Sequence, residues 1–208
     1  MDYWEDTSLS LIITYIGEMI GYILVALPLY VLIRLIIIKK RKKTTSLGRE
    51  AVLGLFALYM VGLLSQTVLP IWNAGIMNGK PYFNIYIYKP APINIIPFHT
   101  IYQYLYSNNS AVDGWEVVST LNLWANLLLF VPLGIFLPLL SKKYRSLLRV
   151  LLSGFISSLC IEFIQFFIGR RADIDDVMLN VIGVLFGFII YRVCRSIIRS
   201  IKKIGTTK

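Results

Sequence analysis

Five long runs of apolar residues decide what this chain can fold into. A helix needs ~20 such residues to cross the hydrocarbon core of a bilayer, and it satisfies its backbone hydrogen bonds internally, as lipid requires. The runs cover roughly residues 9–38, 51–70, 121–140, 147–168 and 177–194. Only 15% of the chain is charged, against about 25% in an average soluble domain. The sequence therefore predicts an all-α membrane protein, a bundle of five transmembrane helices with a long outer interfacial segment.

The charges predict the orientation of these spans. Basic residues concentrate in 39–49, in 141–149 and in the C-terminal tail. All but four of the 21 Lys and Arg residues fall on that side of the alternating spans, together with one acidic residue, Glu50. The acidic start "MDYWEDTS" is unlike the basic start of a cleaved signal peptide. The positive-inside rule then predicts an outer N-terminus and a cytoplasmic C-terminus. It also explains the net charge of +10 without a nucleic-acid partner.

This arrangement divides the chain into three parts. Residues 1–50 form a transmembrane helix with a basic cytoplasmic loop, 51–194 the main transmembrane domain, and 195–208 a basic cytoplasmic tail. The outer segment 71–120 is rich in aromatic residues, which favour the membrane–water interface.

Two stretches of the outer segment have a recognisable periodicity. Its "YFNIYIY" (82–88) alternates like a strand, but without an obvious partner. A stripe of Phe98, Ile101, Tyr102 and Leu105 predicts a short surface helix. That helix is either an interfacial anchor or a lid over an outward-facing site.

Polar side chains from several spans are predicted to lie at similar depth. Assuming ~1.5 Å of rise per residue, they lie roughly 5–9 Å below the outer helix ends, and Glu18 lies ~13 Å deep. Such side chains are costly in lipid and usually face the protein interior. A cleft in the outer half of the membrane explains the set, although interhelical hydrogen bonds are an alternative. The set is Gln66, Asn126, Glu162, Gln165 and Asn180.

The stretch "GRRADIDDVMLNVIGVLFG" (169–187) places charges directly before an apolar run. Asp173, Asp176 and Asn180 share one helical face with two glycines that allow close packing, and Asp175 points elsewhere. Either Asp173 and Asp176 cap this helix, neutralised by the neighbouring arginines, or they face inward at the rim of the cleft. Glu162 lies off the cap, so capping leaves it unexplained.

Four motifs resemble the VanZ-like family of membrane proteins, named after a teicoplanin-resistance determinant of Gram-positive bacteria. They are "NIIPF" (94–98), "NLLLFVPLG" (126–134), "EFIQ" (162–165) and "GRRADIDDVMLNVIG" (169–183). The first helix and the segment 71–93 lie outside this match. The resemblance implies a multi-pass protein of the bacterial plasma membrane and resistance to lipid-tailed glycopeptides, but no catalytic residue to transfer. The family's recurrent polar positions fall on Asn94, Asn126, Glu162, Gln165, Arg170, Asp173, Asp176 and Asn180.

Three kinds of function fit these features. The first is a resistance factor that acts on or shields envelope lipid, with membrane lipid, a lipid-linked cell-wall precursor or a lipoglycopeptide as partner. The second is an enzyme acting on a lipid or lipid-linked sugar. The third is a lipid transporter or flippase that uses Glu18 as a proton relay, although no internal repeat supports it.

For an enzyme or a binding protein, the candidate residues divide by chemistry. Glu162, Asp173 and Asp176 are the candidate acid/base residues. Their oxygens are also suitable ligands for Mg²⁺ or Ca²⁺, so metal and cofactor use stays open. Candidate substrate-binding residues are Asn94, His99, Asn126, Gln165, Arg170 and Asn180.

Overall fold

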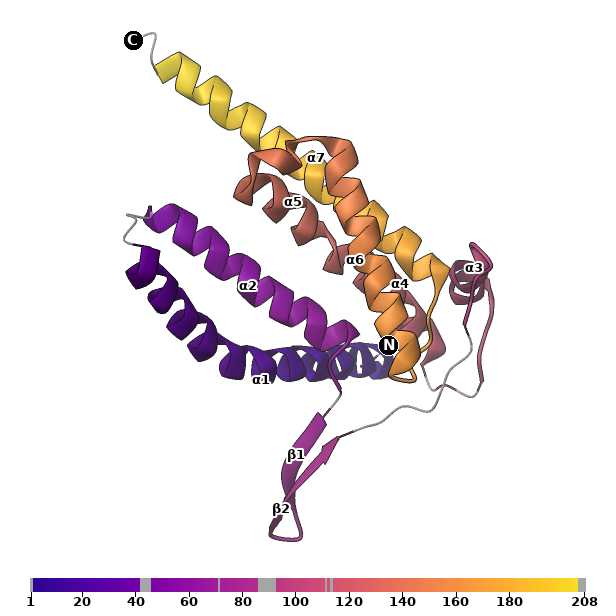
Figure 1. The fold of residues 1–208 in the computed structure, drawn as a ribbon. Helices are drawn as coiled ribbons and strands as arrows, with labels where there is room; N and C mark the ends of the chain where they lie inside the picture. The colour runs from indigo at the N-terminus through magenta and orange to yellow at the C-terminus, as the bar shows by residue number, and fades with distance from the viewer. Residues whose placement is uncertain are drawn as a thin grey trace.

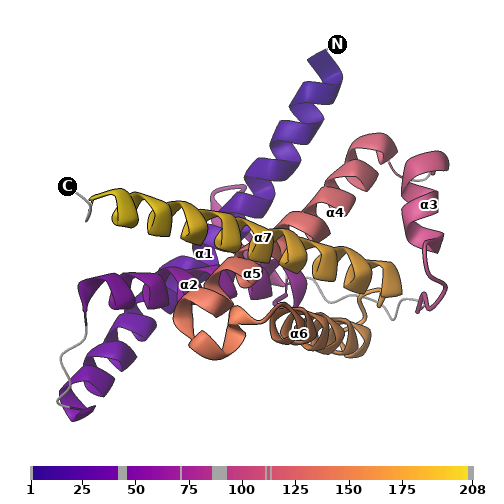
Figure 2. The same ribbon diagram turned by 90° about the horizontal axis from the view of Figure 1, so that it is seen from above.

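The fold is almost entirely helical. The computed structural model describes residues 2–41, 46–70, 72–85, 93–110, 112 and 114–205. Its elements are α1 (Asp2–Arg41), α2 (Leu47–Thr67), β1 (Trp72–Met77), β2 (Lys80–Ile85), α3 (His99–Tyr106), α4 (Trp115–Leu129), α5 (Val131–Leu140), the 3₁₀ turn η1 (Lys142–Arg145), α6 (Leu147–Phe167) and α7 (Ile174–Gly205). Figures 1 and 2 show α4–α7 gathered into a bundle, with α1 and α2 beside it.

Five helical segments are long and apolar enough to cross a membrane, which confirms the predicted number of spans. They are Ile12–Lys40, Leu47–Thr67, Trp115–Leu140, Leu147–Phe167 and Ile174–Lys203. The last is longer than the apolar run predicted, because α7 continues through the basic tail to Gly205. The protein is therefore a multi-pass membrane protein.

The third span is interrupted at Phe130, where α4 ends and α5 begins. Pro132 lies in the first turn of α5. A proline has no backbone N–H and collides with the carbonyl one turn earlier, so it breaks a continuous helix. The Tyr59 hydroxyl of α2 donates to the Leu129 carbonyl oxygen at this break, which partners a backbone group that lipid would leave unsatisfied.

Helix α7 is the centre of the bundle and packs against α4, α5 and α6. A methyl group on Gly183 would collide with the Leu127 carbonyl oxygen, and one on Gly134 with the Val184 carbonyl oxygen. This confirms the prediction that the glycine face of α7 packs closely against another helix. The side chains around this contact form the core: Leu63, Phe130, Leu133, Val150, Ile161, Val184, Phe188 and Tyr191.

Helices α1 and α2 form a hairpin. An ion pair between Arg34 and Glu50 joins them, with Arg34 Nε 2.6 Å from Glu50 Oε2. Pro28 lies inside α1 without ending it, and the ribbon of α1 curves visibly (Figure 1). Helix α1 also contacts α4.

The segment 71–120 begins with a β-hairpin that projects away from the helices (Figure 1). The strand-like pattern does have a partner, because β2 pairs antiparallel with β1. Asn78 and Gly79 connect the strands with φ angles of 51° and 74°, the left-handed values that a tight hairpin turn requires. Residues 86–88 of the predicted strand lie outside the described residues.

The predicted short helix is confirmed as α3. Most of its apolar stripe is exposed: Phe98, Tyr102 and Leu105 have exposed fractions of 60%, 62% and 58%, whereas Ile101 is half-buried. The opposite side of α3 packs against α4 and the start of α7. The indole N–H of Trp115 at the start of α4 donates to the Ser107 carbonyl oxygen just after α3. Helix α3 is therefore held against the end of the bundle where α7 begins.

Candidate functional site

The N-terminus of α7 is capped by side chains from two elements. Asp173 Oδ1 accepts a hydrogen bond from the Asp175 N–H at 3.0 Å, the usual geometry of an N-cap. Glu162 Oε2 on α6 accepts the Asp173 N–H at 2.7 Å. The expectation that Glu162 has no part in capping is therefore wrong. Both carboxylates are buried, with exposed fractions of 7% for Glu162 and 3% for Asp173.

Asn94 joins the segment before α3 to the N-terminus of α7. Its backbone N–H donates to the Ala172 carbonyl, and its own carbonyl accepts the Ile174 N–H. Its side-chain amide donates to Asp173 Oδ1 at 2.8 Å and to Thr100 Oγ1 at 3.0 Å. The Thr100 hydroxyl in turn donates to Asp173 Oδ2. Asp173 is thus surrounded by donors and is part of the framework that positions α3.

Asp175 differs most from its sequence-based prediction. Its spacing placed it on another face of α7, turned outward from the cleft, but its exposed fraction is 0%. Its carboxylate accepts the backbone N–H groups of Phe98, Thr100 and Ile101 at 2.5, 2.8 and 3.1 Å. These N–H groups at the start of α3 lack an intrahelical acceptor, and α3 has no side-chain cap of its own. Asp175 is the cap of α3, supplied from α7.

The inward face of α7 continues with Asp176 and Asn180. Asp176 Oδ1 accepts a hydrogen bond from the Asn126 amide of α4 at 2.5 Å. The Asn180 amide donates to Ser158 Oγ of α6 at 2.8 Å. These two amides therefore serve as interhelical contacts, the alternative that the sequence left open.

The two arginines before α7 have different partners. Arg170 Nη1 donates to the backbone carbonyls of Gln66 and Thr67, which lie at the C-terminal end of α2 where helix carbonyls lack internal partners. Arg171 Nη2 donates to Thr100 Oγ1, and Arg171 Nε lies 3.4 Å from Asp173 Oδ2. The Arg171 side chain is 38% exposed, so part of its guanidinium remains accessible.

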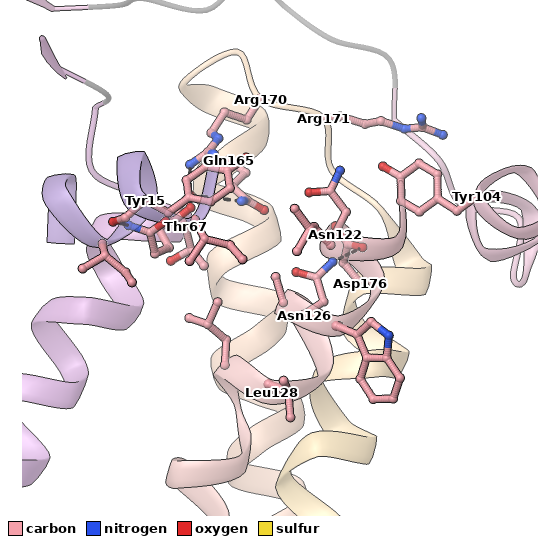
Figure 3. Close-up of a pocket in the computed structure, with 17 residues that line it drawn as sticks. Tyr15, Thr67, Tyr104, Asn122, Asn126, Leu128, Gln165, Arg170, Arg171 and Asp176 are labelled. Carbon is pink, nitrogen blue, oxygen red and sulfur yellow. Dashed lines mark hydrogen bonds between the residues drawn. The ribbon is translucent and has the colours of Figure 1, made fainter. Parts of the chain in front are cut away.

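A pocket of about 480 Å³ lies between α1, α2, α4 and the start of α7 (Figure 3). Its polar lining groups are Gln66, Tyr104, Asn122, Asn126, Gln165, Arg170, Arg171 and Asp176. Apolar side chains of α1 and α4 form most of the remaining wall: Ile12, Ile16, Leu121, Trp124, Ala125, Leu128 and Leu129. In Figure 3 the arginines lie at one end of the pocket and Leu128 at the other, with Asn126 and Asp176 between them. The pocket is thus amphiphilic.

Gln165 and Tyr104 supply hydrogen-bonding groups to the pocket. The Gln165 amide donates to the Thr67 carbonyl, and its buried Oε1 has no partner among the described residues. Burial, followed by the negative charge of Asp176, raises the pKa of the Tyr104 hydroxyl above its ordinary value. The hydroxyl is therefore protonated at neutral pH and remains a donor.

The structure divides the candidate residues into two groups. Asn126, Gln165, Arg170 and Asp176 line the pocket. Asn94, Glu162, Asp173 and Asn180 are buried and are not among its lining residues. His99 is exposed at the start of α3 and contacts Gln103.

The candidate set omitted Asn122, Tyr104 and Trp124, all of which line the pocket. Asn122 lies one turn before Asn126 on the same face of α4, so helical periodicity was a signal that pointed to it. Tyr104 and Trp124 had no such signal, because aromatic residues are common near membrane interfaces.

The acidic residues of the α7 N-terminus face hydrogen-bond donors. Among the described residues, no group of three or more His, Cys, Asp or Glu side chains is placed to hold a metal ion. Asp173 and Asp175 instead accept hydrogen bonds from backbone and side-chain donors.

Most of the chain matches a protein-family model. The model of the family described as VanZ/LLP1 matches residues 56–195, about two thirds of the 208-residue chain. The chain belongs to the VanZ/LLP1 family. The match includes the segment 71–93, which the four VanZ-like motifs had left outside. No curated protein and no solved structure matches the chain.

Proposed function

We propose that this VanZ/LLP1 protein binds an anionic amphiphile of the cell envelope in the pocket beside α7. The headgroup lies against the polar end, and the apolar chain lies along α1 and α4. The observation that carries this proposal is the combination of two guanidinium groups and several amides with an apolar wall in one pocket. Ligand sites in proteins are commonly apolar pockets with a few convergent polar groups.

The polar groups fit a phosphate or carboxylate attached to a sugar or peptide. Guanidinium groups bind such anions through paired hydrogen bonds, and Arg171 is partly exposed. The amides of Asn122 and Gln165 and the hydroxyl of Tyr104 suit hydroxyl and amide groups next to the anion. A lipid-linked cell-wall precursor combines these features with a long apolar chain.

This occupant connects the pocket to the function that the VanZ resemblance implies. Teicoplanin-type drugs have an acyl chain and bind lipid-linked peptidoglycan precursors. A protein that binds the same precursor within the membrane shields it from the drug, and this supplies resistance. The α7 N-terminus is predicted to lie outside, so the pocket is expected on the side from which such drugs arrive.

A binding measurement tests the proposal. Purified protein in nanodiscs of neutral phospholipid is titrated with a labelled lipid-linked precursor. Arg171→Gln removes the accessible cation, and Lys80→Gln removes an exposed charge from the β-hairpin as the matched control. A hydrogen bond to a charged group contributes ~1.5–3 kcal/mol, so Arg171→Gln should weaken binding about ten- to hundredfold. Unchanged affinity in Arg171→Gln, or no preference over neutral lipid, would refute the headgroup site.

A second candidate function, an enzyme, is favoured by the position of Asp176. It is the one candidate acid that lines the pocket, and its carboxylate is oriented by Asn126. Asp176→Asn separates the two functions. An enzyme predicts a changed lipid or precursor profile in cells that is lost in this variant, whereas a shielding protein predicts an unchanged profile in both. A transporter predicts movement of labelled lipid across liposomes.

A further inference from the structure

A second pocket lies at the opposite end of the bundle. It has a volume of about 350 Å³ and is formed by the end of α5, by η1 and by the second half of α7. Ile174 and Arg195 are 21 residues apart on α7, which is about 32 Å of helix at ~1.5 Å per residue. The hydrocarbon core of a bilayer is ~30 Å thick. Arg195 therefore lies at the level where the lipid headgroups of the other leaflet begin.

Four cationic side chains line this pocket, and no acidic side chain does so among the described residues. They are Arg145 of η1 and Arg195, Arg199 and Lys202 of α7. The spacing of the last three, four and then three residues apart, places them on one face of the helix. Like charges at this separation repel one another, so an anion among them is favoured.

The guanidinium of Arg145 supplies an independent observation. Its Nε is buried and has no hydrogen-bond partner among the described residues. Arg195 is fixed by the hydrogen bond from its Nη1 to the Tyr191 hydroxyl at 2.7 Å. One buried donor is thus unused beside a cation that is already oriented. A buried donor without an acceptor costs free energy, and a phosphate oxygen in the pocket would accept from it.

The remaining wall of the pocket is apolar. Ile135 and Leu139 of α5 and Ile190 and Ile198 of α7 also line it. Contact with an apolar surface is favourable for an acyl chain, whereas a small soluble anion gains nothing from it. Basic pockets between transmembrane helices on the cytoplasmic side are a known way of binding anionic lipid headgroups.

We propose that this pocket binds one anionic phospholipid of the cytoplasmic leaflet. The four cations contact its phosphate, and one acyl chain lies on the apolar wall. The site is separate from the pocket beside the α7 N-terminus, so each proposal stands or fails without the other.

Native mass spectrometry of the full-length protein in neutral detergent tests this proposal. The probes are phosphatidylglycerol, zwitterionic phosphatidylcholine and water-soluble glycerol phosphate. The double variant Arg145→Gln/Arg199→Gln removes two of the cations. The control Lys142→Gln/Arg192→Gln removes an equal charge from η1 and α7 at exposed positions that do not line the pocket.

The expected result is one tightly bound phosphatidylglycerol per protein. A cation near an anionic lipid changes affinity about fivefold, so the test variant should bind about 25-fold more weakly and the control variant like the wild type. Glycerol phosphate should not displace the lipid. Equal losses in both double variants, or equal binding of phosphatidylcholine, would overturn the anionic site. Displacement by glycerol phosphate would overturn the lipid as its occupant.

Discussion

Replacing Asp175 by asparagine tests how α3 is positioned. The carboxylate accepts three backbone N–H groups at the start of α3. An asparagine keeps the shape but replaces one acceptor oxygen by an NH₂ group, which then faces N–H donors. Thr100 is buried, with an exposed fraction of 2%, so its N–H cannot form a hydrogen bond with water instead.

The expected loss follows from these three contacts. A buried unsatisfied donor costs ~1–3 kcal/mol, and loss of a helix cap costs ~1 kcal/mol. Asp175→Asn should therefore weaken the docking of α3 by roughly 2–4 kcal/mol. Because only α3 and its neighbours depend on the contact, the effect should be a local opening of the structure.

Hydrogen exchange of the peptide 94–106, followed by mass spectrometry in detergent, measures this opening. A weakening of roughly 2–4 kcal/mol should accelerate exchange at least thirtyfold. Asp176→Asn is the matched control, because Asp176 contacts Asn126 on α4 and none of the three α3 amides. Exchange in Asp175→Asn that equals the wild type, or equals the control, would refute the assignment of Asp175 as the cap of α3.

Three further predictions concern packing and orientation. Glu162→Ala should lower the unfolding free energy by ~1–3 kcal/mol, because it leaves a buried N–H unpaired, whereas Glu162→Gln retains an acceptor; equal melting temperatures for the two variants would argue against the hydrogen bond. Gly183→Ala should prevent close packing of α7 and lower the yield of folded protein, whereas Gly48→Ala should not, because its surroundings are open; equal yields would contradict the close contact. In a cysteine-free background, a cysteine at Ser110 should react with an impermeant maleimide in intact cells and one at Lys142 should not; the reverse result would invert the topology.

The sequence predicted the spans and their closest contact, because both depend on local properties. An apolar run of ~20 residues forms few structures other than a membrane helix. Likewise, Gly183 and Gly187 recur at helical spacing on one face of α7, and that face is where the helix packs.

The positions of the carboxylates were harder to predict, because their partners are distant in the chain. The spacing of Asp175 correctly placed it on a different face of α7 from Asp176, but periodicity says nothing of what covers that face. The covering element is α3, whose Thr100 is 75 residues away in the sequence. Glu162 was misjudged for the same reason, because its partner, the Asp173 N–H, becomes a neighbour only when α6 and α7 pack.

The β-hairpin was missed although its signal was present. Asn78-Gly79 is a strong turn dipeptide, but the strand before it, "WNAGIM", has no clear alternation.

The wall of the pocket was unpredictable in a different way. Helix α1 is apolar on every side, so no periodicity indicates that Ile12 and Ile16 face α4 across the pocket.

Photo-crosslinking in living cells tests the central claim most directly, because it identifies what occupies the pocket beside α7. Benzoylphenylalanine replaces Leu128, which lines the pocket, or Phe155, an exposed apolar residue on α6 that does not. The account predicts that position 128 captures a lipid-linked cell-wall precursor or another anionic envelope lipid, enriched over position 155, and that Arg171→Gln removes this enrichment. Capture of the same bulk phospholipids in the same proportions at both positions would contradict it.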